Sequence, residues 1–253
     1  MFDPYCGAAP VPAEWLGRWN LDPVLIATMA LAAGAQMAWF GREDPAIRHR
    51  KVATSAIVWL LLALAFVSPL CALTSALFSA RVTHHVILVA IVAPLAVLAL
   101  PDRWRQVPAS LSGLGLLALL HAAVLWFWHA PAPYAAALQS HALFWVMELS
   151  LLGSAVLLWL AVLSARAPTV SALLALLLTV IQMGLLGAAI TFAREPLYAA
   201  HFATTQPWGL SVLADQQLAG LIMWVPAVIP YLVAGLIMAG AGLSRMEGIG
   251  RGQ

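Results

Sequence analysis

Seven long apolar stretches constrain the fold of this chain more than any other feature of its sequence. They run over residues 21–40, 52–72, 82–100, 111–129, 141–164, 169–192 and 213–243. A transmembrane helix needs about 20 mostly apolar residues to cross about 30 Å of hydrocarbon. Because a bilayer offers no water to satisfy free backbone groups, each stretch is expected to form an α-helix. The sequence therefore predicts an all-α, polytopic membrane protein with a bundle of seven transmembrane helices.

Composition excludes other classes of protein. Only 9% of the 253 residues are charged and 63% are hydrophobic, whereas an average globular chain carries roughly 25% charged residues. The formal net charge of +2, with no basic run interleaved with aromatic residues, predicts no nucleic-acid partner. The expected partner of the surface is the lipid bilayer. Residues 1–20 are expected to form an outer-face N-terminal segment rather than a cleaved signal, residues 21–243 a single transmembrane domain, and residues 244–253 a cytoplasmic tail.

The distribution of basic residues predicts the orientation. One side of the predicted topology holds nine of them: Arg42, Arg48, Arg50, Lys51, Arg103, Arg105, Arg166, Arg245 and Arg251. The other side holds three: Arg18, Arg81 and Arg194. Cytoplasmic loops carry the excess of Lys and Arg. The N-terminus is therefore expected outside and the C-terminus in the cytoplasm.

This orientation collects five histidines at the outer face. His84 and His85 begin the third span, His129 ends the fourth, His141 begins the fifth, and His201 lies in the loop between the sixth and the seventh. Neutral imidazole is the commonest metal ligand. We therefore treat them as metal-binding candidates, His201 being the weaker one, and expect one of the adjacent pair to approach His129 and His141. The alternative is that they are interfacial histidines that bond loop carbonyls.

Glu148 is expected to support this site from inside the membrane. It lies seven residues after His141 on the same helical face, about 10 Å deeper at 1.5 Å per residue. An ionised carboxylate in the apolar region costs at least a few kcal/mol, so Glu148 should face the bundle interior, protonated or paired. A structural hydrogen bond to Gln182 or His121 is the alternative.

Four more polar residues lie near the same face. Asp215, Gln216 and Gln217 begin the seventh span, and Arg81 precedes His84 and His85 by one turn. An acid in the first turn of a helix is favoured by the helix dipole, which would explain Asp215 without a function. Arg81 would repel a bound cation unless Asp215 or Glu148 pairs with it. These four residues are predicted to support the site rather than to bind the metal.

Recognisable catalytic motifs are absent from the sequence. It contains no GxSxG, HExxH, Walker loop, CxxCH or CxxC pattern. The only lysine, Lys51, lies in the first predicted cytoplasmic loop, which excludes a retinal protein with a seventh-span Schiff base. Cys6 and Cys71 are too few for a disulfide framework. We expect a protein that is not an enzyme, although the sequence leaves a redox activity open.

Three segments together resemble one known family. They are SALFSARVTHHVILVAIVAPLAVLALP, FWHAPAPYAAALQSHALFWVMELSLLGSAVLLW and WGLSVLADQQLAGLIMWVPAVIPYLVA. Their order and spacing over about residues 75–240, with the combination of WHxP, DQQLAG and MWxP, resemble the CtaG family of caa3-type cytochrome c oxidase assembly factors. The matching positions are His84, His85, His129, His141, Asp215, Gln216 and Gln217. Many relatives place a further histidine where this chain has Arg81.

The resemblance implies a function at the outer face. Such a protein of the bacterial inner membrane would assist assembly of a haem–copper oxidase, at the copper step or by holding a subunit. Copper would be a transient cofactor and haem is not expected. The implied partners are cytochrome c oxidase subunits and a periplasmic copper chaperone. Imidazole is one of the ligands that suit copper, and the histidines lie on the side from which copper reaches the oxidase.

Two other classes of function are kept as alternatives. A haem-binding membrane redox protein would use imidazoles from the third span and from the fourth or fifth as axial ligands. A transporter of a small solute or a metal would line a path with Glu148, Gln182 and the seventh span, which Pro226 and Pro230 should kink. Paired repeats with matching broken helices, typical of many transporters, are missing from the sequence.

The predicted orientation can be measured with reporter fusions. Fusions near residues 46, 104 and 166 are expected to report a cytoplasmic location, because the loops there carry most of the basic residues. A periplasmic signal from the loop near residue 104 would contradict both the orientation and the placement of the histidines at the outer face.

Overall fold

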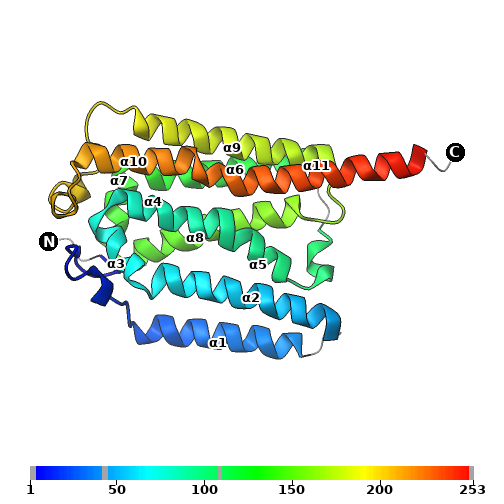
Figure 1. Ribbon diagram of the computed structural model, residues 1–253, viewed down its shortest axis with the longest axis horizontal. Helices are drawn as coiled ribbons and strands as arrows, with labels where there is room; N and C mark the ends of the chain where they lie inside the picture. The colour runs from blue at the N-terminus through cyan, green and yellow to red at the C-terminus, as the bar shows by residue number, and fades with distance from the viewer. Residues whose placement is uncertain (1–3, 42–44, 108–109, 251–253) are drawn as a thin grey trace.

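The computed structural model describes residues 4–41, 45–107 and 110–250, and this part of the chain is helical without strands (Figure 1). Arg42 and Arg251, counted above for the orientation, lie outside the described residues. In chain order, the helices are α1 (Pro23–Phe40), α2 (Pro45–Phe66), α3 (Pro69–Ala76), α4 (Phe78–Val86), the π-helical segment η2 (Ile87–Val92), α5 (Ala93–Ala99), α6 (Leu111–His129), α7 (Pro131–Ala137), α8 (His141–Val162), α9 (Thr169–Thr191), α10 (Val212–Trp224) and α11 (Ile229–Gly250), with short 3-10 turns between some of them.

The prediction of an all-α polytopic membrane protein is confirmed. Within the described residues, six helical runs are long and apolar enough to cross a bilayer: Pro23–Phe40, Ile47–Phe66, Phe78–Ala99, His141–Val162, Thr169–Thr191 and Val212–Ser244. A seventh span is obtained when α6 and α7, which meet at a bend of 75°, are counted as one bent unit. The long helices run side by side (Figure 1). We call the end that carries residues 4–20, α3 and α7 the N-terminal end, and the opposite end the C-terminal end.

Several segments between the expected spans are helical rather than loops. The second span ends at Phe66 instead of residue 72, because Pro69 starts the separate helix α3, whose N-cap is Ser68. The Ser68 hydroxyl accepts a hydrogen bond from the Leu70 N–H. Pro131 starts α7 in the same way. Proline lacks an N–H and disrupts a helix interior, yet it suits the first helical turn.

The third span contains a π-helical turn directly after its histidines. Pro94 cannot donate a hydrogen bond to the carbonyl four residues earlier, and its ring crowds that carbonyl. The helix widens here, so that the Ala93 N–H bonds the Leu88 carbonyl, and Trp159 donates its indole N–H to the Val89 carbonyl at 3.1 Å. Single π-helical turns of this kind are frequent at functional sites.

Close packing of α9 and α10 depends on two glycines. A Cβ atom on Gly220 would lie 2.6 Å from the Gly187 carbonyl oxygen and 2.7 Å from the Thr191 nitrogen. A Cβ on Gly187 would lie 2.8 Å from the Gly220 carbonyl oxygen. Side chains cannot occupy such distances, so glycine at both positions lets α10 approach α9 and holds its first turn against α4.

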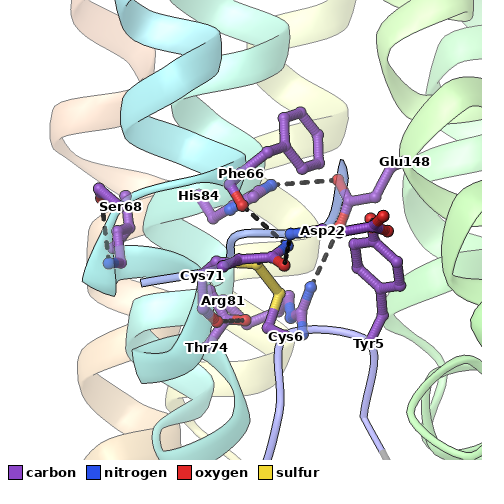
Figure 2. Close-up of a disulfide and its surroundings, with 12 residues drawn as sticks. Tyr5, Cys6, Asp22, Phe66, Ser68, Cys71, Thr74, Arg81, His84 and Glu148 are labelled. Carbon is purple, nitrogen blue, oxygen red and sulfur yellow. Dashed lines mark hydrogen bonds and ion pairs between the residues drawn. A yellow bond between two sulfur atoms is a disulfide. The ribbon is translucent and has the colours of Figure 1, made fainter. Parts of the chain in front are cut away.

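A disulfide joins the N-terminal segment to α3. Cys6 bonds Cys71, and both are buried (Figure 2). The Asn20 amide donates to the Phe66 carbonyl at 3.1 Å, which ties the same segment to the end of α2. The N-terminal segment is thereby held against the N-terminal end of the bundle.

Candidate functional site

Glu148 lies at the centre of a buried cluster of charged and imidazole side chains. Its Oε1 is 3.0 Å from Arg81 Nη1 and 3.4 Å from His85 Nε2, and its Oε2 is 3.3 Å from His84 Nε2. All four side chains are almost completely buried. Figure 2 shows Arg81 and His84 converging on Glu148 beside the disulfide. The partner of Glu148 is thus Arg81, one of the pairings that the sequence left open, rather than Gln182.

Helical spacing places three of these side chains together. Arg81, His84 and His85 occupy positions i, i+3 and i+4 of α4, which lie on neighbouring rows of one helix face. Phe144, one turn before Glu148 on α8, lies under the guanidinium of Arg81 with 5.2 Å between the Arg81 Cζ and the ring centroid. The α4 and α8 helices therefore supply the charged part of the cluster.

Asp215 fixes the position of α4 rather than contacting Glu148. Its carboxylate accepts hydrogen bonds from the Phe78 N–H at 2.7 Å, from the Ser79 N–H at 3.2 Å, and from the Ser79 hydroxyl. Those donors are free amides of the first turn of α4, where negative charge is favoured by the helix dipole. Asp215 thus acts as a cap supplied by α10, and it sets the depth at which Arg81 and the histidines enter the cluster.

His85 connects the cluster to His129 on α6. His85 Nδ1 lies 3.5 Å from His129 Nε2, and His129 Nδ1 lies 2.8 Å from the Leu125 carbonyl oxygen. A carbonyl oxygen only accepts, so Nδ1 of His129 carries the proton and its Nε2 presents a lone pair to His85. The Tyr198 hydroxyl donates to the His129 carbonyl at 2.7 Å and fixes the end of α6.

Several buried polar atoms of the cluster lack a hydrogen-bond partner within the described residues. They are Arg81 Nε and Nη2, His84 Nδ1 and Nε2, His85 Nε2 and Glu148 Oε2. The ring nitrogens of His84 and His85 therefore lie within ion-pair distance of Glu148 but are not aligned for hydrogen bonds. Most buried polar groups in proteins are hydrogen-bonded. The cluster thus retains donors and acceptors that a bound group or water can use.

The cluster offers a metal ion two facing imidazole nitrogens: His129 Nε2 and, in the tautomer that carries its proton on Nε2, His85 Nδ1. Across the residues that the structure describes, no group of three or more His, Cys, Asp and Glu side chains has the arrangement of a metal site. The one carboxylate, Glu148, is already paired with Arg81. His85 and His129 therefore suit an ion that accepts few ligands, and they do not suit a closed tetrahedral site.

The other predicted site residues lie outside this cluster. His141 is exposed, with its ring centroid 5.4 Å from that of Tyr5, so the structure does not bring it to His85 and His129. His201 is buried, with its Nε2 2.6 Å from the Tyr134 hydroxyl and its Nδ1 3.3 Å from the Ala76 carbonyl. Burial lowers the pKa of His201 to about 4.

The two glutamines have different environments. The Gln216 carbonyl accepts from the Leu197 N–H at 2.7 Å, and its amide donates to the Ile190 carbonyl at 3.3 Å, so Gln216 ties the loop before α10 to α9. Gln217 is half-buried. Gln216 therefore has a structural role in α10, where it connects the preceding loop to α9.

Tyr5 was not singled out in the sequence, yet it closes the N-terminal end of the site. Its ring stacks on Phe144 with 4.9 Å between centroids, and its hydroxyl donates to Asp22 at 2.5 Å. Burial and the neighbouring carboxylate raise the pKa of Tyr5 to about 12. The signal available in the sequence was the pair of cysteines, Cys6 and Cys71, both on the predicted outer side.

Removing the charge of Glu148 tests the central ion pair. The variant Glu148→Gln leaves the Arg81 guanidinium buried without a counter-charge, and the free energy of unfolding is expected to fall by about 3–5 kcal/mol. Adding Arg81→Met is expected to restore most of this stability, since replacement of a whole buried pair is often neutral. Thermal unfolding of the purified protein in detergent measures both effects, with the exposed Glu195→Gln as control. A double variant no more stable than Glu148→Gln contradicts the pairing.

The pH dependence of stability tests the environment of His201. Its folded pKa of about 4 lies below the ordinary 6.5, so the unfolded chain binds the proton more readily and stability is lost as the pH falls from about 6.5 towards 4. The contribution amounts to about 3 kcal/mol between pH 7 and pH 4. His201→Gln should remove this part of the pH dependence in unfolding experiments at each pH. If the variant loses as much stability between pH 7 and pH 4 as the wild type, His201 is not the source of this pH dependence.

Comparison with known proteins identifies the family of the chain. The protein-family model described as cytochrome c oxidase caa3 assembly factor (Caa3_CtaG) matches residues 31–243. Neither a curated protein nor a solved structure matches the chain. The match includes α2 to α10, and with them Arg81, His84, His85, His129 and Glu148. Since it covers most of the sequence, the chain belongs to the caa3-type cytochrome c oxidase assembly factor family.

Proposed function

We propose that this protein assists oxidase assembly by holding copper transiently, as cargo, between His85 and His129 at the outer face of the bacterial inner membrane. The observation that carries the proposal is the pair of imidazoles facing each other from α4 and α6, 3.5 Å apart. The Leu125 carbonyl holds the proton of His129 on Nδ1. Outer hydrogen bonds of this kind orient metal-binding histidines and keep the other nitrogen available.

The donor set supports weak and reversible binding. Imidazole nitrogen suits copper, and two facing nitrogens fit an ion of low coordination number. The negative charge of Glu148 is compensated by Arg81, so an incoming cation gains little electrostatic attraction from the cluster. A carrier that must pass copper to an oxidase subunit benefits from such modest affinity. Binding, release and orientation are sufficient for this function, and no substrate is turned over.

The proposed partners follow from the position of His85 and His129 near the N-terminal end of the bundle. Cytochrome c oxidase subunits are the recipients, and a periplasmic copper chaperone is the proposed donor at the N-terminal end. Within the bilayer, the long helices expose apolar side chains such as Leu31, Leu116 and Leu236, on which an oxidase subunit can pack. Holding a subunit through these surfaces is the second candidate function. The haem-binding and transporter alternatives are not favoured by any contact in the described part of the chain.

Alanine substitutions of the facing histidines test the proposal. His85→Ala and His129→Ala are expected to lower oxidase activity and oxidase copper content in host membranes while leaving the assembly factor in normal amount. The matched control is His141→Ala, because His141 lies at the same end of the bundle but is exposed and apart from the cluster. Activity and copper are normalised to the level of each variant protein. Full oxidase copper in both variants would assign the histidines a structural role and leave subunit holding as the function.

A further inference from the structure

A second feature lies at the C-terminal end of the bundle, away from the histidine cluster. A cavity of about 430 Å³ opens between α1, α2, α5 and the loop after α5. We call it the α1 cavity. Three indole rings, Trp39, Trp59 and Trp104, and several alanines, among them Ala35 and Ala96, line it. Its volume lies within the range of about 300–1,000 Å³ that is typical of ligand pockets.

The cavity exists because α1 is loosely attached to the rest of the bundle. The helix packs mainly on α2, at one edge of the molecule (Figure 1), and its buried residues are Leu25 and Phe40. Small side chains such as Ala35 and Ala96 face the space between the helices. Protein interiors are close-packed, and an unfilled void forfeits the dispersion contacts of its walls. In a bilayer, this space is therefore expected to hold a molecule.

The α1 cavity is too small to enclose a partner helix. A helix with its side chains is about 10–12 Å across, so a single 5.4 Å turn already needs on the order of 400–600 Å³. The α1 cavity would hold one turn, whereas a span needs more than five. A slender hydrocarbon chain fits the same space.

The interior of the cavity is chemically suited to hydrocarbon. Gln36 is the polar side chain of its wall, and its Oε1 accepts the indole N–H of Trp59 at 2.7 Å. The two polar groups satisfy each other, so the remaining lining presents mainly aromatic and aliphatic surface. An apolar chain gains contacts here without leaving a buried polar group unpaired.

The mouth of the cavity carries a positive charge. The Arg103 guanidinium lies over Trp39, with 5.1 Å from its Cζ to the ring centroid. Lys51 and Arg105 are 3.9 Å and 3.5 Å from the same carboxylate oxygen of Asp102. The carboxylate of Asp102 is thus engaged by neighbouring cations other than Arg103. Within the described residues, Arg103 has no carboxylate partner.

We propose that the α1 cavity binds an anionic phospholipid, with an acyl chain between α1, α2 and α5 and the phosphate against Arg103. Both parts of the cavity favour this class of ligand: its apolar wall suits an acyl chain, and the positive charge at its mouth suits a negative headgroup. Tryptophans and arginines are also the side chains that anchor proteins at the membrane–water interface. The site is independent of the histidine cluster and of the proposed copper function.

Native mass spectrometry of the full-length protein released from nanodiscs tests this site. With palmitoyl-oleoyl-phosphatidylglycerol, the wild-type protein is expected to retain one lipid. Ala35→Phe fills the cavity and should abolish retention, whereas Ala38→Phe, exposed on the same helix outside the cavity, should preserve it. Arg103→Gln should lower the preference for phosphatidylglycerol over phosphatidylcholine about fivefold. The exposed Arg166→Gln is its matched control.

A photoactivatable phosphatidylglycerol, with a diazirine on its acyl chain, provides a second measurement on the wild-type protein alone. Labelling of the segments that contain Trp59 and Ala96 supports the proposal, and labelling confined to other segments overturns it. Equal retention in Ala35→Phe and Ala38→Phe, or no preference of the wild type for the anionic lipid, also overturns it.

Discussion

The buried ion pair between Arg81 and Glu148 is the interaction on which the arrangement of the site depends. Either charge alone would be costly in an apolar bundle, since the effective penalty is several kcal/mol per buried ion. At 3.0 Å the two charges offset most of that cost for each other. The pair holds α4 and α8 in one register, and His84 and His85 then lie beside Glu148 because they share a helix face with Arg81. The position of the imidazoles is therefore a consequence of charge compensation.

A second constraint acts from the opposite side of α4. Asp215 caps the first turn of that helix from α10, and α10 can come close because Gly187 and Gly220 leave room for it against α9. The DQQLAG segment thus contributes both the cap and one of the two glycines. A motif near a histidine cluster can be needed for packing rather than for ligands, and here the geometry assigns Asp215 and Gln216 to that role.

Much of the fold and part of the site were predictable from the sequence. Long apolar stretches predict spans because the bilayer admits few other structures. Glu148 inside such a stretch predicts a partner, and Arg81, just before the third stretch, is one of the candidates. The choice between Glu148 and Asp215 as partner of Arg81 depends on helix rotation, which periodicity does not specify. The same holds for His141: it begins α8 at the surface, whereas His129 ends α6 with its ring in contact with that of His85. The disulfide and the contacts of Tyr5 join segments far apart in the chain; two cysteines on one predicted side are a signal for the disulfide, whereas no local pattern reveals the contacts of Tyr5.

The helices around Glu148 and the N-terminal segment that covers them are held by different kinds of contact. The helices around Glu148 are tied by the ion pair, by the cap from Asp215 and by the bond between Tyr198 and the end of α6. The N-terminal segment is tied by the disulfide, by the hydrogen bond between Tyr5 and Asp22, and by that between Asn20 and Phe66. Since loops and termini open at lower free energy than packed helices, the residues around Tyr5 are the part of this end that opens most readily, while the disulfide keeps the segment attached. In the proposed copper transfer, His85 and His129 therefore stay in place while the residues around Tyr5 are displaced.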